Sequence, residues 1–358
     1  MRADLALIGF GNVARTFVRL LQDRSSLLSR EYDLDCRIVG ITTRTHGAAY
    51  SARGLDALAA AARIENGGSI GDLDNSAEEE SSTSFTCIER LAASDAPLRV
   101  VVEATTLSID GGQPATRHVE TALSSGCDVV TANKGPVAFA YRRLRALAEK
   151  AGVSFLFEGA VMDGIPVFNL VNEAMPAVRV NGFRGVVNTT TNAIITALEH
   201  GEEFEAALRR MQTAGIAEAD PSLDVEGWDA AAKAAALANV LLDADLTPHH
   251  VDRTGLGGIT AEVVRAALRR GMRLRLVASA RRGQRPVVRP VELPASDLLA
   301  GVSGSANALV LETDLLGDFA ICQLGGNLTQ TAYALLSDLV TIRRRHPAHH
   351  AAPARRSL

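Results

Sequence analysis

The chain has 358 residues, of which 47% are hydrophobic and 22% are charged, and its formal net charge is −4. This length exceeds the size of a usual single core, so we expect two domains, and the apolar share excludes a globally disordered chain. The mildly negative charge gives no reason to expect a nucleic-acid or membrane partner, and no segment approaches the roughly eighteen consecutive apolar residues of a membrane-spanning helix.

The first half of the chain alternates strand patterns with helix patterns. We expect strands at 5–8, 37–41, 100–103, 128–132 and 153–158, and helices at 13–23, 115–124 and 141–150. Alternation of this kind predicts a fold of the α/β class, built on a Rossmann-type, doubly wound parallel sheet. The polar stretch 65–86 interrupts the alternation, and its Gly and Ser content indicates a surface insertion.

The chain changes character after about residue 160. Ala-rich helix patterns at 203–214 and 229–242 now mix with strand patterns at 179–187 and 286–293, which indicates a second domain of the α+β type. We therefore expect a nucleotide-binding Rossmann domain over 1–155, a catalytic and dimerisation domain over 156–305, a segment at about 306–342 that returns to the first domain, and a basic, disordered tail over 343–358.

The cysteines indicate the compartment. The four of them are scattered and form no C-x-x-C pair, which argues against a disulfide framework or a zinc site. No signal peptide is visible at the N-terminus, so we expect a cytoplasmic protein. The cysteines are Cys36, Cys87, Cys127 and Cys322.

A glycine motif, Gly9-Phe10-Gly11-Asn12-Val13-Ala14, directly follows the first strand and opens a helix. In this context Gly9 permits a tight turn, and Gly11 lets a pyrophosphate approach the backbone at the helix N-terminus. The alternative is an ordinary strand–turn–helix with incidental glycines. The placement of the motif favours a dinucleotide site.

A lysine in the second domain follows a group of acids. Asp229 and Lys233 are four residues apart, so they share one face of a helix that is otherwise small or apolar. A solvated ion pair is the ordinary interpretation, but a lysine on a buried helix must be paired or face a cleft, where carboxylates tune it for proton transfer. Glu218, Asp220 and Asp224 would suit an ammonium-bearing substrate, or they are acids favoured by a helix dipole.

The stretch from Gly215 to Lys233 resembles the homoserine dehydrogenase signature, a Glu-x-Asp-Pro loop followed by an Asp-x-x-x-Lys helix. The segments 9–14, 131–134 and 158–166 agree with the same family over about residues 1–342. The resemblance implies reversible reduction of L-aspartate 4-semialdehyde to L-homoserine, a step toward threonine and methionine, by a homodimer. Because only a short tail follows residue 342, we expect the short form without a regulatory domain.

The resemblance also implies roles for single residues. Lys233 would donate the proton to the substrate carbonyl oxygen, and Asp229 would position it. The expected substrate contacts are Glu218, Asp224, Thr190 and Lys134. The expected cofactor contacts are Gly9, Phe10, Gly11, Asn12, Val13, Thr105, Lys134, Gly215 and Gly325. A sodium ion would be held mostly by backbone oxygens at Glu158, Val161, Asp163 and Ile165.

The end of the second strand bears on the choice of cofactor. An acid at this place would accept hydrogen bonds from the ribose hydroxyls of NAD, but the chain has Thr42-Thr43-Arg44. Hydroxyls and a guanidinium suit a 2′-phosphate, so we expect Arg44 to contact NADP, with NAD as the alternative cofactor. An arginine that points into solvent from a loop is the other interpretation.

Two positions depart from the family. Thr189 stands at a usual glycine and could narrow the substrate pocket, and Asn327 stands at another, where asparagine tolerates left-handed backbone. Thr189 leaves a reductase of a related amino-acid aldehyde as a rival function. A non-catalytic NADP-binding regulator is the rival of another class, and the presence of Lys233, Asp229 and Glu218 speaks against it.

Overall fold

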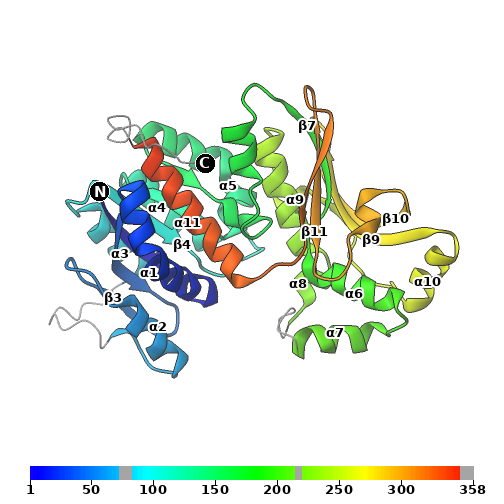
Figure 1. The fold of residues 1–358 in the computed structure, drawn as a ribbon, viewed down its shortest axis with the longest axis horizontal. Helices are drawn as coiled ribbons and strands as arrows, with labels where there is room; N and C mark the ends of the chain where they lie inside the picture. The colour runs from blue at the N-terminus through cyan, green and yellow to red at the C-terminus, as the bar shows by residue number, and fades with distance from the viewer. Residues whose placement is uncertain (72–82, 214–219, 347–358) are drawn as a thin grey trace. The chain divides into compact units, whose positions relative to one another are not determined.

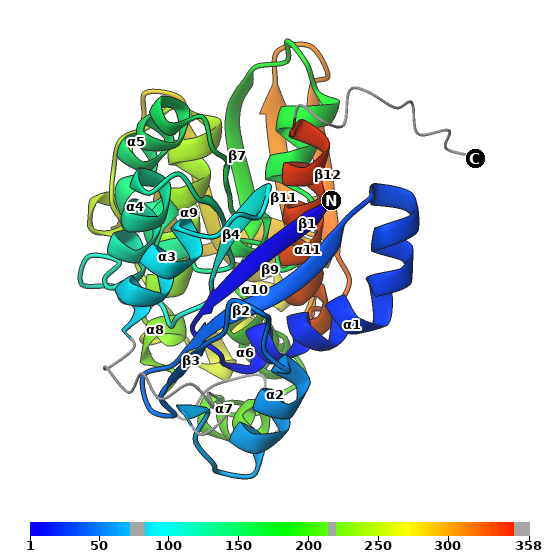
Figure 2. The same cartoon turned by 90° about the vertical axis from the view of Figure 1, so that its left-hand side faces the viewer.

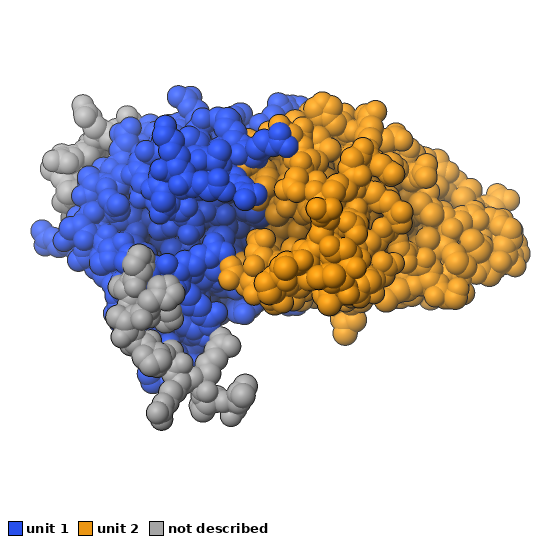
Figure 3. Space-filling model, turned by 90° about the horizontal axis from the view of Figure 1, so that it is seen from above, with its two compact units in different colours: residues 1–136, 142–164, 327–358 blue, residues 137–141, 165–326 orange. Residues whose placement is uncertain are grey.

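The computed structural model describes residues 1–71, 83–213 and 220–346. The chain divides into two compact units, which Figure 3 shows in different colours. Unit 1 comprises Met1–Pro136, Arg142–Gly164 and Asn327–Leu358, and unit 2 comprises Val137–Tyr141 and Ile165–Gly326.

Unit 1 is built on a six-stranded sheet in the order β3-β2-β1-β4-β5-β6. All neighbours are parallel except β2 and β3, which are antiparallel. Figure 2 shows β2, β1 and β4 side by side. The strands are β1 (Arg2–Ile8), β2 (Asp35–Thr42), β3 (Ala48–Tyr50), β4 (Leu98–Glu103), β5 (Asp128–Thr131) and β6 (Phe155–Leu156).

The helices of unit 1 cover this sheet, because parallel strands are apolar on both faces and need cover on each. The C-terminal helix α11 lies beside α1 (Figure 1), and both contribute to one apolar core with the sheet. The elements are α1 (Asn12–Tyr32), α2 (Ala57–Glu65), α3 (Ser84–Ala92), α4 (Ala115–Ser124), α5 (Lys134–Ala151), the 3-10 turn η2 (Glu158–Ala160) and α11 (Leu328–Arg345). The middle of α5, residues 137–141, counts with unit 2.

Unit 2 contains a second six-stranded sheet in the order β12-β11-β7-β9-β10-β8. Its neighbours are antiparallel except β8 and β10. The strands are β7 (Val180–Val186), β8 (Asp252–Arg253), β9 (Met272–Arg281), β10 (Val287–Pro294), β11 (Asn307–Thr313) and β12 (Asp318–Gln323). The predicted fold class, a Rossmann-type sheet with a second α+β unit, is confirmed.

The helices α6, α9 and α10 pack against β9 of this second sheet. Helix α9 is built mainly of alanine, and it is buried over most of its length, as its composition predicts. The helices of unit 2 are α6 (Thr189–Glu199), α7 (Phe204–Thr213), α8 (Ser222–Val225), α9 (Trp228–Leu241) and α10 (Ala261–Arg269), with the short turns η3 (Leu170–Ala174), η4 (Pro248–His250) and η5 (Leu298–Gly301).

The structure divides the chain at places other than residues 155 and 305. Because β11 pairs with β7 and β12 pairs with β11, residues 307–323 belong to the second sheet, and the chain returns to unit 1 at Asn327. The stretch 65–86, expected as an insertion, contains the start of α3, and its residues 72–82 lie outside the described residues.

The expected tail at 343–358 begins inside helix α11. Arg343 is only 3% exposed and donates a hydrogen bond to the Asp33 carboxylate at 2.8 Å, so it belongs to the packed structure of unit 1. The remainder of the tail from 347 lies outside the described residues. All four cysteines are free. In the described part of the chain, no helix is long and apolar enough to cross a membrane.

Candidate functional site

A cleft of about 480 Å³ lies in unit 1 at the carboxyl ends of β1, β2 and β4. Its walls include the loops 9–11, 42–46 and 104–106, each of which begins where one of these strands ends. The strand order reverses between β1 and β4, which is the place where open α/β sheets bind ligands. The predicted residues Gly9, Phe10, Gly11, Arg44 and Thr105 all line this cleft.

The glycine loop has the shape that a dinucleotide needs. Gly9 has a φ of +90°, and a Cβ there would lie 2.7 Å from the carbonyl carbon of Ala104, so no other residue fits without a shift. A Cβ on Gly11 would have no described atom within 4 Å, which leaves open space against the backbone. Helix α1 begins at Asn12 with no acid in its first turn, so its N-terminal N–H groups suit a phosphate.

The neighbouring residues of the motif have other contacts. Asn12 accepts a hydrogen bond from the Arg15 guanidinium at 2.6 Å, and Arg15 also donates to the Phe10 carbonyl oxygen at 3.1 Å. Arg15 lines the cleft, although sequence reasoning did not select it. Val13 lies in the first turn of α1. A cation one residue after the motif was the signal that could have identified Arg15.

The loop after β2 is held by its own hydrogen bonds. The Thr43 hydroxyl donates to the Gly47 carbonyl oxygen at 2.9 Å and accepts from the His46 backbone N–H at 2.8 Å. Arg44 is exposed on this ordered loop and lines the cleft. The described residues that line the cleft include no carboxylate, so this wall suits an anionic ligand.

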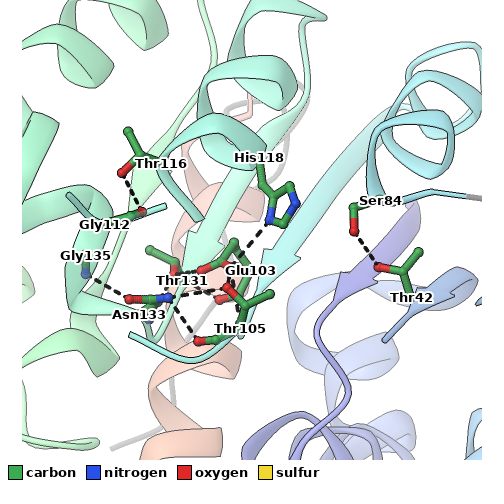
Figure 4. A network of polar contacts seen from close by, with 10 residues as sticks. All are labelled: Thr42, Ser84, Glu103, Thr105, Gly112, Thr116, His118, Thr131, Asn133 and Gly135. Atoms are coloured by element: carbon green, nitrogen blue, oxygen red, sulfur yellow. Dashed lines mark hydrogen bonds and ion pairs between the residues drawn. The ribbon is translucent and has the colours of Figure 1, made fainter. Parts of the chain in front are cut away.

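A buried carboxylate lies behind the loop after β4 (Figure 4). Glu103 ends β4 and has no exposed surface. It accepts hydrogen bonds from both the backbone N–H and the hydroxyl of Thr105, the first at 3.1 Å, and from the Thr131 hydroxyl at 3.0 Å. Nδ1 of His118, whose side chain lines the cleft, is 3.8 Å from the Glu103 carboxylate. Sequence analysis did not select Glu103, whose only signal was an acid at the end of an apolar strand.

Lys134 is the first residue of α5, and Asn133 caps that helix. The Asn133 side-chain oxygen accepts from the Gly135 N–H at 2.8 Å, while its amide nitrogen donates to the Thr105 carbonyl oxygen at 2.9 Å. The start of α5 is therefore tied to the loop that lines the cleft.

A second polar cluster lies in unit 2. Asp229 and Lys233 lie one turn apart on α9, with 3.3 Å between the carboxylate and Nζ, and each side chain is 15% exposed. Lys233 also donates a 2.6 Å hydrogen bond to the Val187 carbonyl oxygen. The lysine is thus directed by two acceptors rather than lying free in solvent.

Asn188 connects the acids of this cluster, and sequence reasoning missed it. Its amide nitrogen donates to Asp224 at 2.7 Å and to Asp229 at 2.9 Å, and its oxygen caps α6 by accepting from the Thr191 N–H at 2.8 Å. The signal that could have identified it was an asparagine directly before Thr189, a position at which the chain departs from the family. One side chain therefore holds two carboxylates close together and begins the helix behind them.

The two carboxylates influence one another. Burial raises the pKa of Asp224 above its usual value, and the neighbouring Asp229 raises that pKa further. Hydrogen bonds from Asn188 and Thr190 to Asp224 and the charge of Lys233 act in the opposite direction. A cluster of this composition favours a positively charged group in the space beside it.

Several predicted residues lie elsewhere. Gly215 and Glu218 are outside the described residues, and Gly325 belongs to unit 2. The Thr189 hydroxyl accepts a 2.9 Å hydrogen bond from Asn307 on β11. The expected left-handed backbone at Asn327 is wrong: its φ is −156°, because this residue is the extended N-cap of α11 and accepts from the Gln330 N–H at 3.0 Å.

The segment expected to hold sodium has an irregular backbone. Glu158 is buried in the 3-10 turn η2, and its N–H donates to the Asp338 carboxylate at 2.8 Å. Asp163 has a φ of +50° and accepts from the Thr331 hydroxyl at 3.1 Å. No group of three or more His, Cys, Asp or Glu among the described residues could hold a metal. Val161 and Ile165 lie outside the 3-10 turn, and backbone oxygens on an irregular stretch are the ligand type that suits a hard cation.

The chain was compared with known proteins. A family model described as homoserine dehydrogenase, NAD binding domain, matches residues 9–158, and one described as homoserine dehydrogenase matches residues 166–340. The NAD(+)-dependent homoserine dehydrogenase of Pseudomonas canavaninivorans is 35% identical over 342 residues, which cover 94% of this chain and 95% of that protein.

Two solved structures are similar over nearly the whole chain. A putative homoserine dehydrogenase from Archaeoglobus fulgidus has a TM-score of 0.82 at 28% identity, covering 95% of this chain and 99% of its own. A hyperthermophilic archaeal homoserine dehydrogenase in complex with NADPH has a TM-score of 0.78 at 27% identity, covering 97% and 99%. The family models and the relatives together show that the chain belongs to the homoserine dehydrogenase family of NAD(P)-dependent oxidoreductases.

Proposed function

We propose that the chain catalyses the reversible reduction of L-aspartate 4-semialdehyde to L-homoserine with Lys233 as the proton donor. The observation that carries this proposal is the environment of the Lys233 ammonium group. Its Nζ donates a hydrogen bond to the Val187 carbonyl oxygen and forms an ion pair with the Asp229 carboxylate at 3.3 Å, and an ammonium group has three N–H donors with which it can also serve a substrate oxygen.

The residues of unit 2 account for the proton and for substrate charge. As the aldehyde is reduced, its carbonyl oxygen gains negative charge, and Lys233 donates a proton to it. A bound reduced nicotinamide supplies the hydride. Asp224, held by Asn188 and Thr190, presents a carboxylate to the substrate ammonium group, and we assign Glu218 to the same group by resemblance.

We assign the cleft of unit 1 to the cofactor and propose a preference for NADP over NAD. Gly9, Gly11 and the start of α1 would hold the pyrophosphate, and Thr105 would contact the nicotinamide half. Arg44 supplies donors for a 2′-phosphate, and no described residue of the cleft supplies a competing carboxylate. By resemblance we also assign six further residues to the contacts with the cofactor: Phe10, Asn12, Val13, Lys134, Gly215 and Gly325.

The rival functions are less well supported. A reductase of a related amino-acid aldehyde rests on Thr189, whose hydroxyl is engaged by Asn307 and therefore directed toward β11. A non-catalytic regulator would have no use for a lysine directed by two acceptors. Initial rates with homoserine and a small panel of amino alcohols would separate the first rival from the proposal.

Three further parts of the proposal rest on the resemblance. We propose a homodimer, a sodium ion at Glu158, Val161, Asp163 and Ile165, and a cytoplasmic location, which is in keeping with the four free thiols. Light scattering coupled to size-exclusion chromatography would test the dimer. To test the ion, activity is measured after sodium has been removed and again after sodium or potassium has been returned.

The decisive experiment on the mechanism is Lys233→Ala, with Lys150→Ala, an exposed lysine on α5, as the matched control. We expect kcat for homoserine oxidation to fall by about two to four orders of magnitude in the first variant, because a proton-transfer group is lost. The dissociation constant of the cofactor should be unchanged in both. Near-normal turnover of Lys233→Ala would refute the assignment of the proton donor.

A further inference from the structure

We propose that Glu103 is a positioning residue of the cofactor site. Its carboxylate fixes Thr105 and, through Asn133, the first turn of helix α5, which carries Lys134. The inference rests on the proposed function in one respect, the contact between Thr105 and the cofactor. Glu103 itself ends β4 behind the cleft and has no exposed surface.

Hydrogen bonds from two threonines satisfy the buried Glu103 carboxylate. A carboxylate without access to water is costly unless hydrogen bonds replace the lost hydration. One oxygen of Glu103 accepts both the backbone N–H and the hydroxyl of Thr105, and the other accepts the Thr131 hydroxyl at 3.0 Å. Two bonds from one residue fix both the backbone and the side chain of Thr105.

These bonds belong to a network that also includes Asn133 (Figure 4). Asn133 donates from its backbone N–H to the Thr131 hydroxyl at 2.9 Å and from its side chain to the Thr105 carbonyl oxygen at 2.9 Å. The same side chain caps α5 through the Gly135 N–H. The Glu103 carboxylate therefore acts directly on Thr105, and the Thr105 carbonyl oxygen in turn accepts from the side chain that caps α5.

Another buried carboxylate of unit 1, Asp4, has partners of a different kind. Asp4 lies in the adjacent strand β1 and is 1% exposed, but it is paired with the Arg37 guanidinium at 2.8 and 2.9 Å and with the Ser94 hydroxyl at 2.5 Å. None of these residues lines the cofactor cleft. The partners of Glu103 instead include Thr105 and the nearby imidazole of His118, which do line it.

The test compares Glu103→Ala, Glu103→Gln, Thr105→Ala and the double variant Glu103→Ala/Thr105→Ala, with Asp4→Asn as the control. Dissociation constants of the reduced and oxidised cofactor are measured by fluorescence titration, and melting temperatures are measured in parallel. We expect Glu103→Ala and Thr105→Ala each to weaken cofactor binding about tenfold, as the loss of a polar contact or its support does. The double variant should lose less affinity than the sum of the two single losses, because Glu103 acts partly through the Thr105 hydroxyl and keeps only the backbone bond when that hydroxyl is absent.

The conservative variant and the control separate positioning from stability. Glu103→Gln keeps an oxygen that can accept from Thr105, so it should bind the cofactor more tightly than Glu103→Ala. Asp4→Asn should lower the melting temperature and leave cofactor affinity unchanged. If Glu103→Ala does not fold, Glu103→Gln alone and combined with Thr105→Ala provides the same comparison.

Each outcome decides either the assignment of Thr105 to the cofactor or the positioning role of Glu103. Unchanged cofactor affinity in Thr105→Ala overturns the assignment of Thr105 under the proposed function. Weaker binding in Thr105→Ala together with wild-type binding in both folded Glu103 variants overturns the role of Glu103. Additive losses in the double variant show that Glu103 does not act through Thr105 and also overturn the inference.

Discussion

The substitution Asn188→Ala should reduce both stability and substrate binding, and its magnitude can be worked from the contacts. Asn188 is 4% exposed, and its side chain makes four hydrogen bonds: it donates to the carboxylates of Asp224 and Asp229, and it accepts from the N–H of Thr191, which caps α6, and from the Thr191 hydroxyl. The Thr191 hydroxyl can donate instead to the Asn188 backbone carbonyl oxygen at 3.2 Å, so its bond is left out of the calculation. Hydrogen bonds to charged groups contribute about 1.5–3 kcal/mol each, and the lower value applies where water can replace the donor. Two such bonds at the lower value, with about 1 kcal/mol for the cap, lower the free energy of unfolding by about 4 kcal/mol.

Asn188→Ser is the matched variant, because serine also caps helices well. Its free energy of unfolding should fall by about 3 kcal/mol, because the cap survives and the two hydrogen bonds from the side-chain amide to the carboxylates do not. Urea denaturation gives both values. In either variant the acids lose the donor that holds them together, so KM for homoserine should rise about tenfold, the equivalent of one lost polar contact.

Asn192→Ala is the control for a buried asparagine on the same helix. Asn192 is 1% exposed and donates to the Ala306 carbonyl oxygen at 3.0 Å, away from the acids. Its replacement should lower stability without raising KM. The reasoning is refuted if Asn188→Ala and Asn188→Ser each lose less than about 1 kcal/mol, or if Asn192→Ala raises KM to the same extent.

Three other predictions concern separate parts of the molecule. Arg44→Ala should reduce a preference for NADP over NAD of about ten- to a hundredfold, measured as the ratio of kcat/KM values, and an unchanged ratio would remove Arg44 from the site. Burial raises the pKa of Cys36 and Cys87 to about 12, and Cys322 is exposed, so a thiol reagent at pH 8 should rapidly modify one cysteine per folded chain and all four after unfolding. Because the pKa of Asp224 is raised, its carboxylate is protonated as pH falls through a value above 3.8, and kcat/KM for homoserine should fall there. Asp224→Asn should abolish that part of the pH profile, and its persistence would assign it to another group.

Local features could be predicted from the sequence because they depend on neighbours along the chain. The turn at Gly9 requires a glycine whose place is set by the strand before it and the helix after it. Asp229 and Lys233 share a face because a helix repeats every 3.6 residues, and the alanine content of α9 indicated its burial. In unit 1 the alternation of patterns predicted β1, β2, β4, β5 and β6, but it did not predict β3, α2 or α3.

Only the tertiary structure decided which distant residues meet. Asn188 reaches Asp224 across 36 positions, and Glu103 reaches Thr131 across 28, because each pair is joined by packing or strand pairing that periodicity does not encode. An acid at the end of a strand and an asparagine in a turn are ordinary in sequence, since both are common at exposed positions. Their roles depend on burial, and burial is a property of the assembled sheet and helices.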